Sequence, residues 1–200
     1  MRQILLVLCT LTLAACSSVE SINYYQLDGG EFPANKDVNL LNANVIVSAP
    51  TLTGHLANRG IAVEVSPLQI QSANNHLWSA SPSELLLQAS VVSLDQSLPS
   101  MRVLPLQLES AITSSLPTYR VDYYINKLQA DMAGNGVITG TVTIYQLKHT
   151  TAHLVFSEGI TQKIALEEDG YSALVQSINR AWLSINHKTA SALKALADKG

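Results

Sequence analysis

A long run of helical periodicity at the end of the chain restricts the fold more than any other sequence feature. After Asp169-Gly170, mostly apolar residues recur at steps of three and four for about seven turns. The stripe consists of Tyr171, Leu174, Val175, Ile178, Trp182, Ile185, Thr189, Leu193 and Leu196. This spacing predicts one long amphipathic helix, and such a helix needs a flat partner to cover its apolar side.

Three segments that precede this helix provide the expected partner. Residues 119–130, 137–147 and 153–166 alternate apolar and polar side chains, which is typical of strands with one buried face. The first two are joined by Ala133-Gly134-Asn135-Gly136, which contains the Asn-Gly pair that favours a tight hairpin. The expected inward residues of the last two strands are Ile138, Val142 and Ile144, then Leu154, Phe156, Ile160, Ile164 and Leu166. We therefore predict an α+β fold in which helices pack on one face of an antiparallel sheet.

Shorter elements are expected earlier in the chain. A helix is predicted from Ser81 to about Asp95, because Ser81 and Glu84 form a capping pattern with Pro82 at the first helical position. Strands are predicted at 44–48, 60–65 and 68–71, with a turn at Asn74-Asn75 before His76-Leu77-Trp78. One or two helical turns are expected at 50–56, and a short helix at 106–115.

The N-terminus has the features of a lipoprotein export signal. Arg2 is followed by about a dozen apolar residues, too few to span a bilayer, and then by Leu13-Ala14-Ala15-Cys16. This tetrapeptide resembles the bacterial lipobox, in which the cysteine is acylated and the signal is removed before it. An ordinary signal peptide with an accidental cysteine is the alternative. We predict a signal peptide at 1–15, a lipidated tether at 16–23 and a single periplasmic α+β domain at 24–200, with Cys16 as the lipid attachment site.

The surroundings of Cys16 also predict where the domain resides. Ser17 rather than an aspartate follows the cysteine, which resembles lipoproteins sorted to the outer membrane, so we expect the domain to face the periplasm there. Seven residues separate Cys16 from the strand-like run that begins at Tyr24, which allows a reach of about 25 Å. The second cysteine, Cys9, lies within the signal, so packing rather than disulfides must stabilise the domain.

Composition and motifs argue against several functional classes. With 12 Lys and Arg against 15 Asp and Glu, and no basic patch, the chain is not expected to bind nucleic acid. It contains no nucleophile elbow, phosphate-binding loop or zinc-protease motif. His149 and His153 are four apart, but in a strand context this spacing does not place both rings on one side. We therefore expect no catalytic residues, no metal site and no cofactor.

Two residues are candidates for contact with a partner. Arg59, just before a predicted strand, could bind a partner carboxylate or a lipid phosphate, and the alternative is a solvated arginine. Trp78 could anchor a partner through its large indole, and the alternative is packing in the core.

Several short runs of the sequence resemble one family. They are Tyr24-Tyr25-Gln26-Leu27, Leu56-Ala57-Asn58-Arg59-Gly60-Ile61, His76-Leu77-Trp78 and Tyr119-Arg120-Val121-Asp122-Tyr123, in addition to the lipobox. With these runs the chain resembles the ABC-type transport auxiliary lipoproteins, the PqiC-like group. It departs from that group at Leu56-Ala57-Asn58-Arg59, where a Tyr-Leu-Asp-Arg-like run is common, and at Leu77, where an Arg or Lys often precedes the Trp.

The resemblance implies an auxiliary subunit of an intermembrane transport system. Such a lipoprotein would dock MCE-domain and permease proteins, which move lipids or other hydrophobic molecules between the two membranes, and would not hydrolyse ATP. Several copies of this chain in one leaflet would form a collar, since anchoring makes weak contacts sufficient. A periplasmic enzyme and a non-transport envelope assembly or stress lipoprotein, such as a pilotin-like adaptor, are the alternatives.

Overall fold

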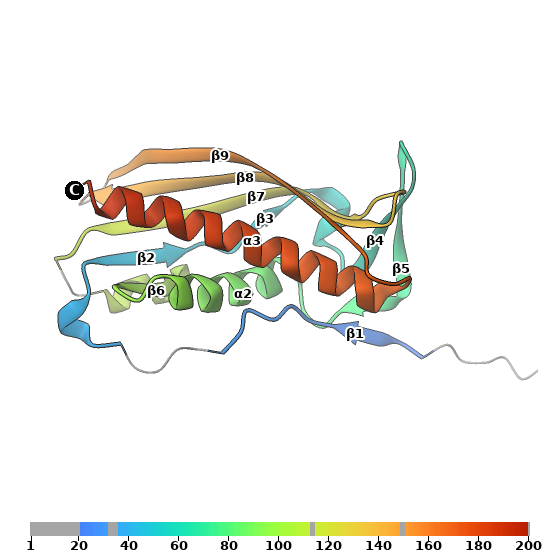
Figure 1. Cartoon of the computed structure of the whole chain (residues 1–200), viewed down its shortest axis with the longest axis horizontal. Coiled ribbons are helices and arrows are strands. Elements are labelled where there is room, and N and C mark those ends of the chain that lie inside the picture. The colour runs from blue at the N-terminus through green and yellow to red at the C-terminus, as the bar shows by residue number, and fades with distance from the viewer. Residues whose placement is uncertain (1–20, 32–35, 113–114, 149–150, 200) are drawn as a thin grey trace, which may run out of the picture.

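The computed structural model describes residues 21–31, 36–112, 115–148 and 151–199. Within these residues, nine strands form one sheet, and two α-helices lie along one of its faces (Figure 1). The strands are β1 (Asn23–Tyr25), β2 (Ala43–Val47), β3 (Thr51–Leu52), β4 (Gly60–Ser66), β5 (Gln69–Trp78), β6 (Met101–Pro105), β7 (Thr118–Ala130), β8 (Asn135–Lys148) and β9 (Thr151–Ala165). The helices are α2 (Pro82–Ser97) and α3 (Tyr171–Ala197), with short 3-10 helices η2 (Val38–Leu40), η3 (Gly54–Ala57) and η4 (Leu106–Ala111).

The predicted long helix and its sheet partner are both present. α3 buries the central part of the predicted stripe, from Leu174 to Leu193, while Tyr171 and Leu196 pack half-buried at its ends. β7, β8 and β9 pair as an antiparallel meander, and α3 contacts all three strands as well as α2. The α+β class, the helices on one face of the sheet and the long C-terminal helix are therefore confirmed.

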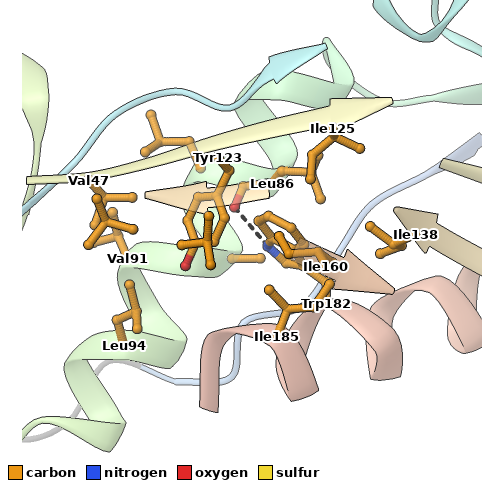
Figure 2. Close-up of a cluster of buried hydrophobic side chains, with 14 of the residues drawn as sticks. Val47, Leu86, Val91, Leu94, Tyr123, Ile125, Ile138, Ile160, Trp182 and Ile185 are labelled. Atoms are coloured by element: carbon orange, nitrogen blue, oxygen red, sulfur yellow. Dashed lines mark hydrogen bonds between the residues drawn. The ribbon is translucent and has the colours of Figure 1, made fainter. Parts of the chain in front are cut away.

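The centre of the core lies where α2, α3 and β7 meet (Figure 2). Trp182 is fully buried, and its indole Nε1–H donates a 3.1 Å hydrogen bond to the backbone carbonyl of Leu86 in α2. Its ring packs against Tyr123 of β7 at 4.9 Å between centroids, and the Tyr123 hydroxyl donates to Oδ1 of Asn186 at 2.9 Å. Each polar group carried inward on these aromatic rings thus has a partner, as burial requires.

The sheet is mixed, whereas the sequence analysis expected antiparallel pairing throughout. β1–β5, β2–β6, β2–β7, β3–β7 and β4–β7 are parallel pairs. One edge of β7 pairs with β8, and its other edge is shared by β2, β3 and β4 in succession. The alternation of side chains reveals that a strand has a buried face, but it does not determine which neighbour the strand pairs with or in which direction.

The expected turn at Asn74-Asn75 is absent, because β5 continues through these residues to Trp78. The pairing between β4 and β5 shifts there, from Ala62 opposite Ser72 to Gly60 opposite Leu77, which marks an irregular, bulged stretch rather than a chain reversal. A Cβ atom at Gly60 would lie 2.6 Å from the carbonyl oxygen of Ala73. The absence of a side chain at Gly60 therefore permits the close approach of the two strands.

One of the inward residues expected in the third meander strand points the other way. Phe156, Ile160 and Ile164 face the core, but Leu154 is largely exposed. A register shift causes this difference: Ile144 pairs with Phe156, yet the next residue of β8, Tyr145, pairs with Leu154. The extra residue in β9 reverses the alternation that precedes it.

Other local expectations were met in part. The Ser81 cap is confirmed, since its hydroxyl oxygen accepts a hydrogen bond from the Glu84 amide at 3.3 Å. Residues 50–56 form the short strand β3 and part of η3 rather than an α-helical segment, and the helix expected at 106–115 is the 3-10 helix η4. The strand β6 was not predicted, because five residues between two prolines are too few to show a periodicity.

Candidate functional site

The predicted lipid attachment site, Cys16, lies outside the described residues. Ser21 is the first described residue, and the five residue steps from Cys16 to Ser21 can span at most about 18 Å. The surface around the beginning of β1 is therefore the part of the domain that lies nearest to that cysteine along the chain.

Arg59 lies at this surface and is exposed, but its guanidinium already has partners. Its Nε donates to the carbonyl of Trp78 at 2.8 Å, and Nη2 donates to the carbonyl of Ser79 at 3.1 Å. The guanidinium also lies over the ring of Tyr24 in β1, 5.2 Å from the centroid. Arg59 thus joins the end of β5 to β1, and it displays a cation beside an exposed tyrosine.

Trp78 occupies a different environment from the one that a surface anchor requires. It is the last residue of β5, pairs with Tyr25 of β1, and has only 3% of its surface exposed. Its side chain belongs to the main hydrophobic core. The structure therefore places Trp78 as a packing residue, and of the two partner-binding candidates only Arg59 reaches solvent.

A ring cluster that the sequence analysis did not identify connects β1 to α3. His76 stacks on Tyr171, the first residue of α3, with 4.0 Å between ring centroids. Its Nδ1 lies 2.8 Å from the hydroxyl of Tyr25, and the two groups form a hydrogen bond. No local sequence signal could reveal this cluster, because its three members come from segments 51 and 95 positions apart.

We use the term anchor end for residues 21–25, the β4–β5 turn with its flanking residues 64–71, the β7–β8 turn at 131–134 and the first turn of α3. These segments lie together at one end of the molecule, on the right in Figure 1. Half of the large apolar side chains that are exposed in the described chain belong to this end: Ile22, Tyr24, Val65, Leu68, Ile70 and Met132. Leu68 is 100% exposed, at the tip of the β4–β5 hairpin.

Two ion pairs lie in or next to the anchor end. Asp131 and Lys163 form an ion pair with 2.6 Å between Oδ2 and Nζ, and Arg180 pairs with Glu167. Burial acts to raise the pKa of Asp131, but hydrogen bonds from Lys163, Asn135 and the turn backbone outweigh it and lower the pKa to about 2. These pairings order the β7–β8 turn and the beginning of α3, which is a structural role.

A broad groove lies along α2, away from the tip of the β4–β5 hairpin. It has a volume of about 900 Å³ and is bordered by α2, β6, η4 and the segment 27–30. Its walls are mainly apolar and include Leu87, Val92 and Leu108. Gly29 allows the bordering segment to lie directly on the helix, since a Cβ there would come within 2.7 Å of the Ala89 carbonyl oxygen.

The described residues contain neither a metal-binding cluster nor a membrane-spanning helix. No group of three or more His, Cys, Asp or Glu side chains is arranged there to hold a metal ion. No helix in the described part of the chain is both long and apolar enough to cross a membrane. His153 lies exposed in β9, and its predicted neighbour His149 lies outside the described residues.

A family model described as ABC-type transport auxiliary lipoprotein component matches residues 25–190. The chain belongs to this family. The resemblance found in the sequence is therefore confirmed, and the protein is a transport auxiliary lipoprotein, which makes it a membrane-associated protein of the cell envelope. A search of curated protein sequences gave no match.

Two solved structures share the fold of this auxiliary lipoprotein. One is the crystal structure of an uncharacterized protein, 21% identical, with a TM-score of 0.70 over 87% of this chain and 99% of that one. The other is a Xanthomonas campestris protein of a family of unknown function, 13% identical, with a TM-score of 0.65 over 88% of this chain and 97% of that one. At these identities the likeness concerns the fold alone.

Proposed function

We propose that this auxiliary lipoprotein is anchored in the outer membrane through Cys16 and docks the MCE-domain and permease components of an intermembrane transport system. The transported cargo would be lipids or other hydrophobic molecules. The observation that carries the proposal is the family match, which extends over residues 25–190 and so includes nearly the whole of the described domain.

The sequence before the domain supports the anchoring part of the proposal. Leu13-Ala14-Ala15-Cys16 has the lipobox pattern, and Ser17 fits retention at the outer membrane. Three acyl chains on one cysteine would give essentially permanent attachment, since each buried CH₂ contributes about 0.8 kcal/mol. Because β1 begins at Asn23, the tether is too short for the domain to move far from the membrane, so its partners must come to it.

We propose a binding role rather than a catalytic one. The described groups with clearly shifted pKa values, Tyr119, Tyr123 and Asp131, lie within the sheet and its turns. Burial raises the pKa of Tyr123, whose hydroxyl donates to Asn186 in the core. Asp131 is occupied by its own turn and by Lys163. Burial of the two tyrosines and the hydrogen bonds of Asp131 explain the shifts through folding, without a substrate.

Self-association would suit this role. Copies held in one leaflet meet at a high effective concentration, so weak contacts between domains are enough to form a collar around the end of a transport assembly. The collar would then depend on the lipid anchor, which concentrates the copies. Removing the lipid would weaken both the contacts between copies and the binding of partners.

The anchoring part is tested by fractionating membranes from cells that express the wild type, Cys16→Ala or Cys9→Ala, and by measuring the intact mass of the mature proteins. Cys9→Ala is the matched control, because this cysteine lies in the segment that we expect to be removed. We expect the wild type and Cys9→Ala to begin at an acylated Cys16 in the outer membrane, and Cys16→Ala to lose the acyl mass. Acylation with inner-membrane location would refute the outer-membrane assignment, and an unmodified Cys16 would refute the anchor.

The docking part predicts that MCE-domain and permease proteins are recovered with the lipoprotein after mild crosslinking. An outer-membrane lipoprotein that is recovered instead with a different envelope machine would favour the assembly or stress adaptor.

A further inference from the structure

We propose that the tip of the β4–β5 hairpin, formed by Val65, Leu68 and Ile70, inserts into the surface of the same leaflet that holds the lipid anchor, and that its preferred lipid is zwitterionic. The proposal rests on the proposed acylation of Cys16, because that anchor sets the membrane to which the tip has access. It adds a second, protein-mediated membrane contact that would fix the orientation of the domain.

The first argument is the composition and exposure of the tip. Val65 is 42%, Ile70 40% and Leu68 100% exposed, and all three lie within six consecutive residues around a single turn. One exposed leucine on a protein surface is ordinary, but a group of three at the end of a projecting hairpin is not. In Figure 1 the free end of β4 and β5 rises beside the β7–β8 turn and away from α3.

The second argument is the geometry of the tether relative to the hairpin. β1 pairs with β5 in parallel, with Asn23 opposite His76. Because the two strands run in the same direction, the residues before Asn23 and the residues of β5 before His76 leave this pair at the same end. The first lead to Cys16 and the second lead to the hairpin tip. Seven steps separate Asn23 from Cys16 and seven separate His76 from Gln69, lengths of up to about 25 Å and about 23 Å at the usual rise per residue. The acylated cysteine and the hairpin tip can therefore reach one common plane.

The third argument comes from the neighbouring charges, which select the lipid. The basic Lys163 is already paired with Asp131, and Arg180 with Glu167, so these cations are not available to anionic headgroups. The exposed Arg59 donates to the carbonyls of Trp78 and Ser79 and lies over Tyr24. The other charged groups near this end are the exposed Lys127 and three acidic residues, namely Glu64, Glu168 and Asp169. A tip with apolar side chains and this acidic surplus fits a zwitterionic surface such as phosphatidylethanolamine better than an anionic one.

The tip can be tested with a tryptophan reporter in the full, acylated protein. The native Trp78 and Trp182 are buried, so a tryptophan at position 68 adds an exposed signal that the difference from wild type isolates. Leu68→Trp and the matched control Leu154→Trp, which lies exposed on β9, are reconstituted into phosphatidylethanolamine–phosphatidylcholine vesicles with or without brominated acyl chains. Val65→Trp provides an independent reporter on the same tip, should Leu68→Trp fail to fold.

We expect the brominated lipid to quench the added tryptophan at the tip at least about twofold more than the one at position 154, with a blue shift of its emission. Replacing part of the lipid with phosphatidylglycerol should not increase the effect. Equal quenching at the two positions, or quenching that needs the anionic lipid, would overturn the proposal.

Flotation of the same samples distinguishes failure of the tip from failure of the anchor. Protein that floats with the vesicles but shows no selective quenching at positions 68 and 65 leaves the anchor intact and overturns the membrane contact of the tip. Protein that does not float overturns the anchor, and with it the inference built upon it.

Discussion

The ion pair and turn at Asp131 allow a quantitative test of the forces that order the meander. Its Oδ1 accepts hydrogen bonds from the backbone N–H groups of Ala133 and Asn135, at 3.0 and 2.9 Å, and from the Asn135 side chain at 2.8 Å. Its Oδ2 lies 2.6 Å from Nζ of Lys163. Only 16% of the Asp131 side chain is exposed, so water screens these contacts only in part.

The size of the effect follows from the pKa of Asp131. Burial acts to raise this pKa, but the contacts outweigh it and lower the pKa from 3.8 to about 2 in the folded protein. A carboxylate with a depressed folded-state pKa adds stability above its unfolded-state pKa, and this stability is lost as the pH falls toward the folded-state value. The shift corresponds to a contribution of about 2 kcal/mol at neutral pH.

The perturbation is Asp131→Asn, and the assay is urea unfolding of both proteins at a series of pH values from 7 to 2. We expect the wild type to be more stable at pH 7, and this advantage to shrink by about 2 kcal/mol between pH 4 and pH 2. Glu158→Gln on the exposed surface of β9 is the control for removing one negative charge, with an expected change below about 0.5 kcal/mol. A stability difference between wild type and Asp131→Asn that stays constant over this range would refute the reasoning.

Three further substitutions test the packing described above. Trp182→Ala should lower the free energy of unfolding by about 3 to 5 kcal/mol in urea titrations, because it empties the centre of the core, and a loss under 1 kcal/mol would contradict this. His76→Ala should destabilise the attachment of β1 by about 1 kcal/mol, seen as faster hydrogen exchange in β1 with unchanged exchange in the middle of α3; uniform acceleration would contradict a local role. Gly60→Ala should cost roughly 1 to 3 kcal/mol in thermal or urea unfolding, because its Cβ would clash with the Ala73 carbonyl, and wild-type stability would contradict the close approach.

Much of the fold was predictable because its largest elements have strong local periodicity. The stripe from Tyr171 to Leu196 and the alternation in β7 and β8 each repeat several times, so single exceptions do not hide them. The Ser81 cap was predictable for a related reason, since a cap depends on residues three positions apart.

The remaining features depend on contacts between segments that are distant in the sequence. The parallel pairing of β2, β3 and β4 with β7 leaves no mark on the alternation of any single strand. The exposure of Leu154 depends on a bulge, and the passage of β5 through Asn74-Asn75 depends on Gly60 in another strand. The turn propensity of Asn74-Asn75 is therefore overridden by the pairing of β5 with its neighbouring strand.

In the candidate site, too, some features have a local sequence signal and others depend on contacts between distant segments. The Cys16 motif is a short linear signal and could be predicted from sequence, whereas the burial of Trp78 is set by its position at the end of β5, where its side chain is part of the core. The full exposure of Leu68 was equally inaccessible, since Leu68 and Ile70 have the alternation of an ordinary half-buried strand.

The most direct test of the central claim is to crosslink the intact envelope mildly, isolate this lipoprotein and identify what is attached to it. The samples are the wild type, Cys16→Ala and the control Cys9→Ala. Our account predicts that MCE-domain and permease proteins accompany the wild type and Cys9→Ala, and are lost with Cys16→Ala. Their reproducible absence from a wild-type protein that is still located at the outer membrane would contradict it.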